Sequence, residues 1–434
     1  MQVSVEKTSE LSRKMTVTLP DTLVQEKMES RFKKLAKEVK VAGFRPGKVP
    51  VSTVKKLYGE RVKSEVSGDL IQSTYFEALQ QQDLVPAGYP NIVPAEKDEG
   101  FEYVAEFEVY PQISLDAVEG VAINRPNAVV TDADVDNMIE KLRQQKKSWA
   151  AVVERSSKEG DKATLNFSGT SEGENFTDGK VENYAVEIGG KQMIPGFEDE
   201  LIGLSVGESK TFTVTFPEKY NSEKLAGKAA EFEVELVKLE EPVLPAVDAE
   251  FIKAYGVEGG SAEDFRADVR VNMERELAQG LKNKLKTAVL DVLFENINVT
   301  LPNALIDQEI QTLMKPYADR ASKAKLKLED LNLPRDMFEN QARRRVALGL
   351  ILGEIIKKHE MKVDAERVRA VIDDMAKSYE KPEDVVNWYY ADQSRLNDVN
   401  QMVLEDQAVD WVIERAKVTD INLAFEEVMD RPQA

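Results

Sequence analysis

The chain of 434 residues is too long for a single hydrophobic core and predicts about three domains, and it contains no apolar run long enough to cross a membrane. It has no cysteine and only one histidine, His359, so the composition excludes disulfides, thiolate catalysis, cysteine-bound metals and histidine-centred catalytic or metal sites. The net charge of −20 argues against nucleic-acid binding by the whole molecule, and the first residues form no apolar signal segment, so we expect a soluble cytoplasmic protein.

Residues 1–112 predict an α+β domain. Alternating apolar and polar residues in Gln2 to Lys7 and Leu11 to Leu19 indicate two strands, and Phe101 to Tyr110 indicates another. Between them, Asp21 is placed to cap an amphipathic helix, and a second helical pattern runs from about residue 51 to residue 82. The apolar positions of the first helix recur every three or four residues: Val24, Met28, Phe32, Leu35 and Val39.

The amino-terminal end is basic although the chain is acidic. Residues 1–70 hold 15 Lys and Arg against 9 Asp and Glu, a charge of +6, so the remainder carries −26. This asymmetry is compatible with a module that meets a polyanion and equally with a solvated helix face.

Residues 113–149 are predicted to begin with an extended piece and to connect this domain to the next. A helix is expected to open at Thr131 and to run through Trp149. The spacing of Asp132, Asp134 and Asp136 is superficially that of a calcium loop, but Asn137 stands where such a loop needs glycine. The pattern therefore favours a helix start with acidic residues in its first turn.

The rest of the chain changes character twice. Residues 150–243 show short alternating strands separated by glycines, which predicts a compact β-rich domain. Residues 244–434 are mainly helical in pattern, with long charged helices near 262–297, 302–324, 336–360 and 364–378, and His359 at the polar end of one of them. The predicted fold class is a multidomain α+β protein with an all-α carboxyl-terminal domain.

A loop between the two amino-terminal helices contains two glycines and two prolines, which predicts a structured turn. The turn either presents Phe44 as an exposed anchor beside cations or tucks it into the local core. Gly43-Phe44-Arg45-Pro46-Gly47-Lys48-Val49-Pro50 resembles the ribosome-binding signature of the trigger factor family. The resemblance implies that Gly43 to Lys48 contact the large ribosomal subunit, meeting a ribosomal protein and rRNA phosphates near the exit tunnel.

In the β-rich domain, aromatic side chains could form a barrel core or line a pocket. Gly190 to Glu198 and Glu231 to Leu236 resemble the pocket floor and the last strand of FKBP-type prolyl isomerases. The resemblance implies a catalytic pocket formed by Phe167, Phe176, Met193, Ile194, Phe197, Tyr220 and Phe232. By the same resemblance, the Ile194 N–H and the Tyr220 hydroxyl hold substrate carbonyls, and no metal or cofactor is needed. FKBP-like sites often carry an acid directly after the residue equivalent to Phe176, and this chain has Thr177 there, followed by Asp178.

Seven of the twelve methionines lie beyond residue 250, and they are compatible either with ordinary helix packing or with an adaptable binding surface. The trigger factor resemblance spans nearly the whole chain and implies a ribosome-associated chaperone whose helical arms bind nascent and unfolded polypeptides. It leaves a homodimer away from the ribosome open. Two alternatives remain at this stage, a free prolyl isomerase with recruiting or dimerising flanks and a helical scaffold with an inactive isomerase fold.

Overall fold

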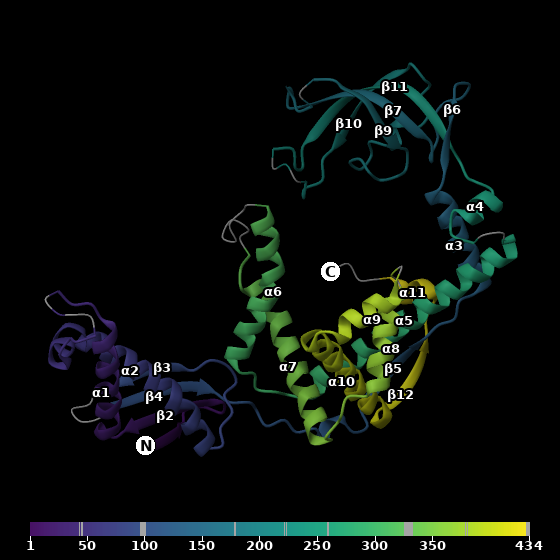
Figure 1. Cartoon of the computed structure of the whole chain (residues 1–434). Helices are drawn as coiled ribbons and strands as arrows, with labels where there is room; N and C mark the ends of the chain where they lie inside the picture. The colour runs from purple at the N-terminus through teal and green to yellow at the C-terminus, as the bar shows by residue number, and fades with distance from the viewer. Residues whose placement is uncertain are drawn as a thin grey trace. The chain divides into compact units, whose positions relative to one another are not determined.

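The computed structural model of the chain describes residues 1–42, 44, 47–95, 101–177, 179–220, 222, 224–257, 260–324, 333–377, 379 and 381–430 (Figure 1). Two compact units divide the chain, Met1–Pro126 with Asn283–Ile421 and Asn127–Lys282 with Asn422–Ala434. Within the described ranges, no helix has both the length and the apolar character that a membrane crossing requires.

The first unit opens with a four-stranded antiparallel sheet in the order β1-β2-β4-β3. Its strands are β1 (Gln2–Lys7), β2 (Ser12–Leu19), β3 (Asn91–Ala95) and β4 (Phe101–Glu108). The helices α1 (Asp21–Glu38) and α2 (Val51–Gln81) bury their apolar faces in the same core, as the period of the sequence predicts. Phe32 and Leu35 enter this core from α1, and Val54 and Val62 enter it from α2.

Three details of this region differ from the predictions. Pro20 is the N-cap of α1 and makes no side-chain cap, so Asp21 is the first helical residue and accepts a hydrogen bond from Gln25 Nε2 at 2.6 Å. Val39 has extended backbone, and the helix ends at Glu38. Strand β3 was not predicted; its Pro94 is tolerated because β3 lies at the edge of the sheet.

Most of the helical part belongs to the first unit. Its helices are α5 (Ala262–Asn296), whose amino-terminal part lies in the second unit, α6 (Asn303–Lys323), α7 (Asp336–Lys358), α8 (Ala365–Ala376), α9 (Pro382–Tyr390) and α10 (Gln393–Arg415). Leu293, Ile351 and Val412 come from three of them and pack in one core. His359 is exposed, as predicted, and its ring lies 4.3 Å from that of Trp411.

A two-stranded pairing joins distant parts of the chain. Strand β5 (Ala122–Asn127), which follows the short 3₁₀ helix η1 (Asp116–Val118), pairs with β12 (Lys417–Asn422). Arg125 Nε donates to Asp420 Oδ1 at 2.6 Å across it. Strand β5 lies where the sequence predicts an extended piece, but its pairing was not predicted. Strand β12 was not predicted, and the carboxyl-terminal domain is therefore not entirely helical.

The second unit contains a six-stranded antiparallel sheet with a path β10-β11-β7-β8, on which β6 pairs with β11 and β9 with β7. Its strands are β6 (Ser148–Val152), β7 (Lys162–Ser171), β8 (Glu174–Asn175), β9 (Val181–Glu187), β10 (Ser209–Thr215) and β11 (Ala229–Val243), and a 3₁₀ helix, η2 (Asp199–Leu201), precedes β10. Along β7, Ala163, Leu165 and Phe167 point into the core, as the alternation predicts.

The helix predicted to run through Trp149 is shorter. Helix α3 (Asp132–Gln145) ends early, and Trp149 lies in β6 opposite Pro242 of β11. The ammonium groups of Lys147 and Lys162 lie 4.8 and 5.5 Å from the centre of the Trp149 ring, which favours this position.

The start of α3 is a capping box, as the acidic first turn indicates. Thr131 N–H donates to the Asp134 carboxylate at 2.8 Å, and Asp134 N–H donates to Thr131 Oγ1. The calcium-loop alternative is excluded, because Asp132 and Asp136 are paired with arginines of α5. Two short helices, α4 (Ala249–Lys253) and α11 (Phe425–Met429), share the core beside α3 and α5.

Candidate functional site

An aromatic cluster fills the centre of the six-stranded sheet. Strands β7, β10 and β11 contribute Phe167, Phe212 and Phe232, and the turn before η2 contributes Phe197. The Phe197 ring centre lies 5.0 Å from Phe232, 5.3 Å from Phe212 and 6.0 Å from Phe167, all in edge-to-face contact. Phe197 is completely buried, so the cluster is a rigid floor whose central ring does not reach solvent.

Partly exposed aromatic rings surround this floor. Phe176 is half-buried, 5.5 Å from Phe232 and 5.6 Å from Phe216. Tyr220 lies 4.7 Å from Phe216 and remains 39% exposed, so its hydroxyl is accessible to a ligand. Tyr184 lies 5.7 Å from Phe167 and is also exposed.

The structure therefore brings the sequence-derived pocket residues together, but in two layers. Phe167, Phe197 and Phe232 form the floor, and Phe176, Met193, Ile194 and Tyr220 are partly or largely exposed around it. The predicted catalytic set leaves out Phe212 and Phe216, and also Tyr184, which the sequence places among the aromatic side chains of this domain. The alternation of residues 210–216, with Phe212 and Phe216 on one face, was the signal that could have identified two of them.

Phe176 is positioned by Gly169 of β7. A Cβ atom at Gly169 would lie 2.3 Å from Phe176 Cζ, so the ring packs directly on the glycine backbone. Phe176 N–H donates to Gly169 O at 3.1 Å, and Gly169 N–H donates to Thr177 Oγ1 at 3.2 Å. The Thr177 hydroxyl also lies 2.7 Å from Gly179 O, so Thr177 stabilises the turn that carries Phe176. Asp178 lies outside the described residues.

Glu198 holds the loop that carries Met193. Its buried carboxylate accepts hydrogen bonds from the N–H groups of Lys191 at 2.9 Å, Gln192 at 2.7 Å and Met193 at 3.0 Å. Burial by itself raises the pKa of Glu198, but the backbone N–H donors, that of Met193 foremost, outweigh it and hold the pKa below the usual value. An ionised carboxylate thus fixes the loop at neutral pH.

This loop leaves one backbone donor available. Ile194 O accepts from Phe197 N–H at 3.1 Å, whereas the Ile194 N–H has no acceptor among the described residues. A half-buried donor beside an aromatic floor can receive the carbonyl oxygen of a bound peptide.

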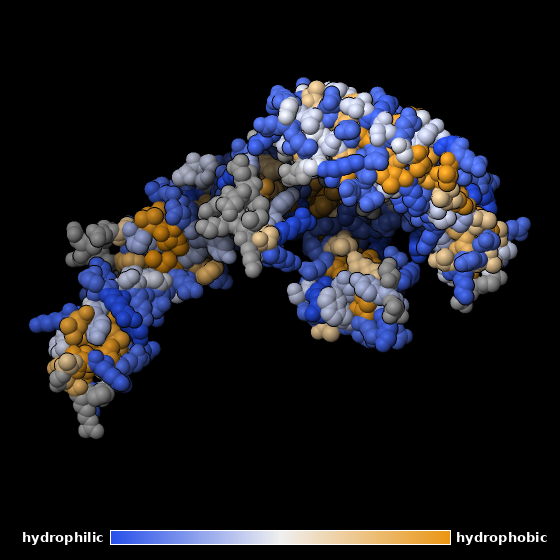
Figure 2. Space-filling model, turned by 90° about the horizontal axis from the view of Figure 1, so that it is seen from above, coloured by the Kyte–Doolittle hydropathy of each residue, from blue (hydrophilic) through white to orange (hydrophobic). Residues whose placement is uncertain are grey.

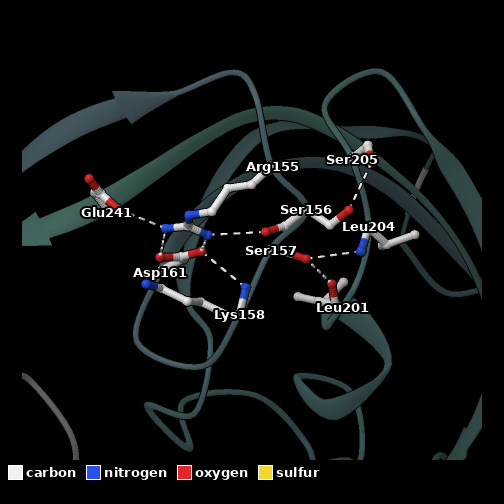
Figure 3. A network of polar contacts seen from close by, with 9 residues as sticks. All are labelled: Arg155, Ser156, Ser157, Lys158, Asp161, Leu201, Leu204, Ser205 and Glu241. Carbon is white, nitrogen blue, oxygen red and sulfur yellow. Dashed lines mark hydrogen bonds and ion pairs between the residues drawn. The ribbon is translucent and has the colours of Figure 1, made fainter.

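A polar network fastens the loop before β7 to the rest of the sheet (Figure 3). Asp161 is fully buried and accepts from Arg155 Nη1 at 2.5 Å and Nη2 at 2.8 Å, and Arg155 also donates to Glu241 of β11. Burial by itself raises the pKa of Asp161. The hydrogen bonds from Arg155 and from the Lys158 N–H lower this pKa by more than burial raises it, so it lies below its usual value. Ser157 Oγ joins the same loop to Leu201 O at 2.5 Å and to Leu204 N–H at 3.0 Å.

The loop after α1 presents Phe44 to solvent. The Phe44 side chain is 41% exposed, which disfavours the alternative of a residue tucked into the core. Its N–H donates to Val41 O at 3.1 Å, and Gly47 adopts a positive φ of 78°, which suits glycine. Lys48 is exposed, and Gly43, Arg45 and Pro46 lie outside the described residues.

The helical part of the first unit also exposes apolar side chains. Met337 is 62% exposed, and Trp388 is 51% exposed on α9, whereas Met273 in the second unit is buried. A groove of about 720 Å³ runs beside α9, with Met375, Tyr379 and Trp388 in its lining. Figure 2 shows hydrophobic residues in separate patches among hydrophilic ones. Across the described part of the chain, no group of three or more His, Asp or Glu side chains could hold a metal ion.

Comparison with known proteins defines the class of the aromatic site first. Residues 153–237 match the family model of FKBP-type peptidyl-prolyl cis-trans isomerases, so the middle of the chain is an isomerase domain of that type. Residues 1–142 match the model of the bacterial trigger factor protein, and residues 261–414 match that of its C-terminus. The chain belongs to the trigger factor family of chaperones.

Curated relatives align from end to end. The trigger factor of Stutzerimonas stutzeri is 44% identical over 439 residues, covering all of both chains, and that of Pseudoalteromonas atlantica is 43% identical over 435 residues, covering 99% of this chain and all of the relative. A solved structure, from work on promiscuous substrate recognition in the folding and assembly activities of the trigger factor chaperone, has a TM-score of 0.51. It covers 95% of this chain and 99% of its own at 16% identity, and it supports the fold.

Proposed function

We propose that this chain docks on the large ribosomal subunit beside the exit tunnel and binds nascent and unfolded polypeptides as they emerge. The observation that carries the docking proposal is the exposed Phe44, which stands beside the exposed Lys48 in a loop of the basic amino-terminal domain. An aromatic anchor next to cations suits a surface of protein and phosphate. A ribosome-associated role implies a cytoplasmic location, and the absence of cysteine agrees with it.

Co-sedimentation with bacterial ribosomes at moderate salt tests the docking loop. The wild-type chain is expected to pellet, and a variant combining Phe44→Ala, Arg45→Ala and Lys48→Ala is expected to stay in the supernatant. Lys7→Ala with Lys14→Ala is a matched control, because it removes two cations of the same domain far from the loop in sequence. If neither the wild type nor the variants pellet, a free isomerase becomes the better assignment.

The isomerase domain is proposed to catalyse rotation about X-Pro bonds with the aromatic cluster and the Ile194 N–H. Rotation must cross an amide barrier of roughly 18–20 kcal/mol, and the twisted amide has lost the charge separation of the planar form. A water-poor aromatic floor therefore favours the twisted state, while the Ile194 N–H and the Tyr220 hydroxyl hold flanking carbonyls. Thr177 makes bonds within its own turn and supplies no carboxylate, so we expect modest turnover.

Isomerisation of an X-Pro peptide, followed by exchange spectroscopy, tests the site in the full chain. Tyr220→Phe removes one proposed donor without changing the ring, and Phe176→Ala removes a half-buried ring at the edge of the aromatic floor. Both are expected to lower kcat/KM, the first by about fivefold to tenfold, the effect of one neutral hydrogen bond. Ile202→Ala, a substitution of an exposed residue of the same domain outside the aromatic core, is the control. Unchanged kcat/KM in both variants would favour the inactive-scaffold alternative.

We propose that each part of the chain has its own role. Residues 1–112 dock on the ribosome, residues 113–149 form a connector, residues 150–243 catalyse isomerisation and residues 244–434 bind polypeptides. Exposed apolar residues such as Met337 and Trp388 support the last assignment. A chain lacking residues 150–243 is expected to keep its ability to suppress aggregation of an unfolded protein. Complete loss of that ability would refute the division.

A further inference from the structure

A second cationic feature of the amino-terminal domain lies apart from the docking loop. A groove of about 210 Å³ between α1 and α2 is lined by Lys27, Ser30, Arg31 and Lys34 of α1 and by Asp69 and Ser73 of α2. Positions 27, 31 and 34 fall on one face of a helix, because they are spaced by four and three residues. Three cations thus converge on one concave polar surface, where Asp69 of α2 lies in the lining and Glu65 of α2 pairs with Arg31.

The hydrogen-bond donors in this groove are incompletely used. Arg31 Nη2 binds Glu65 at 2.6 Å, and Nη1 lies 3.8 Å from Glu38, but the buried Nε has no acceptor among the described residues. Lys27 and Lys34 form no ion pair within the described part of the chain. An anionic ligand in the groove would neutralise the two ammonium groups of Lys27 and Lys34.

The hydroxyl groups on the two sides differ. Ser73 Oγ already donates toward the backbone oxygens of Asp69 at 2.8 Å and Leu70 at 3.1 Å, so it has no proton left for an anion. The Ser30 hydroxyl has no partner among the described side chains and backbone, so it can donate. The available donors therefore lie on α1, and Asp69 limits the affinity for an isolated anion.

We infer that this groove binds a backbone phosphate of RNA, as a second contact that rests on the proposed ribosome docking. Lys27 lies 11 residues before the end of α1 at Glu38, about 17 Å along the helix axis. Only an extended polyanion offers phosphates both there and at the loop that follows α1. Because Asp69 weakens a single-anion site, the contact gains its strength from counterion release along a polyelectrolyte.

The salt dependence of ribosome affinity measures phosphate contacts directly. Lys27→Ala with Lys34→Ala removes the contact with this one phosphate, so the slope of log affinity against log salt is expected to become shallower by about 0.7 to 0.9, with a loss of affinity of roughly fivefold to tenfold near 0.1 M salt. The matched control is Lys33→Ala with Lys14→Ala, which removes equal charge from the same domain outside the groove. The control is expected to keep the wild-type slope.

A gain-of-binding variant separates the contact from any loss of folding. Asp69→Asn removes the carboxylate that lines the groove, leaves the Arg31–Glu65 pair in place and is expected to bind ribosomes severalfold more tightly. An unchanged salt slope in the variant that lacks Lys27 and Lys34 overturns the inference. If that variant also binds ribosomes more weakly, the groove contacts a protein and not RNA.

The Phe44 loop variant separates this inference from the docking proposal. If the wild type pellets with ribosomes and the loop variant does not, an unchanged slope overturns the groove contact alone. If the wild type does not pellet, both the docking proposal and the groove contact are refuted.

Discussion

Glu198 gives the sharpest test of how the isomerase loop is held. Glu198→Gln keeps the size of the side chain but replaces one oxygen by an NH₂ group. If the remaining oxygen takes the place of Oε1, the bonds from Gln192 and Met193 survive. The Lys191 N–H, which donated to Oε2 at 2.9 Å, then faces another donor and is left unsatisfied.

The loss of stability in Glu198→Gln follows from these hydrogen bonds. One charge-assisted hydrogen bond is lost and a partly buried donor is stranded, which together destabilise the loop by about 1.5–3 kcal/mol. Local opening of the loop should therefore become roughly tenfold to a hundredfold more frequent. Since the loop carries Ile194, we also expect kcat/KM for an X-Pro peptide to fall while the sheet stays folded.

Amide hydrogen exchange of the full chain measures this opening in residues 189–194. Glu200→Gln is the matched control, because Glu200 follows on the same turn but its side chain is 44% exposed and, among the described residues, forms an ion pair with Lys210 alone. Faster exchange confined to the loop in Glu198→Gln, with no change in the control, is expected. Equal exchange in wild type and Glu198→Gln would refute the role of the carboxylate.

The lowered pKa of Glu198 adds a pH dependence with a defined sign. A carboxyl whose folded pKa lies below its usual 4.5 stabilises the fold above that value and loses the contribution as the pH falls through the folded pKa. Loop protection in the wild type should decline below about pH 4.5. In Glu198→Gln this part of the pH dependence should disappear.

Three further substitutions test other parts of the chain. Asp161→Asn breaks the pair between the fully buried Asp161 and the partly exposed Arg155 and should lower the melting temperature of the isomerase domain by about 8 °C or more, from a cost of roughly 2 kcal/mol; calorimetry showing no shift would contradict it. Gly169→Ala should displace the Phe176 ring and reduce kcat/KM by about tenfold to a hundredfold with the fold intact, and a crystal structure with an unmoved ring would contradict it. The Tyr75 hydroxyl is buried without a partner among the described residues, and burial, with a contribution from Tyr103, raises its pKa to about 12, so Tyr75→Phe should stabilise the amino-terminal domain by about 1 kcal/mol in urea unfolding.

Local sequence patterns predicted much of the secondary structure. The three- and four-residue spacing that includes Phe32 and Leu35 placed α1 and its buried face, and the alternation from Lys162 onward placed β7. These predictions succeeded because burial repeats with the period of the element. Asp21 was misplaced by one position, since a helix start depends on backbone angles that a residue type only favours.

Long-range pairings were beyond the reach of such patterns. Strand β5 meets β12 almost 300 residues later, where the pairing partner rather than local propensity decides the structure. Trp149 sat in a helical pattern for the same reason and pairs with β11 instead. At the site, the resemblance to FKBP-type isomerases predicted the aromatic residues. The packing of Phe176 on Gly169 and the hydrogen bonds from the loop to Glu198 were not predicted, because they depend on turns that only the folded chain brings together.

The two proposed activities place opposite demands on the chain. The isomerase floor is completely buried at Phe197 and fixed by Glu198 and Asp161, because a twisted amide is favoured only by groups that do not relax. Polypeptide binding needs adaptable apolar residues such as Met337, each of which contributes a weak contact. Docking at the tunnel exit would resolve this difference, since a tether raises the local concentration of the emerging chain and makes weak contacts sufficient. The charges of the two parts, +6 for residues 1–70 and −26 for the remainder, fit that proposal, because a polyanionic ribosome would attract the first and repel the second.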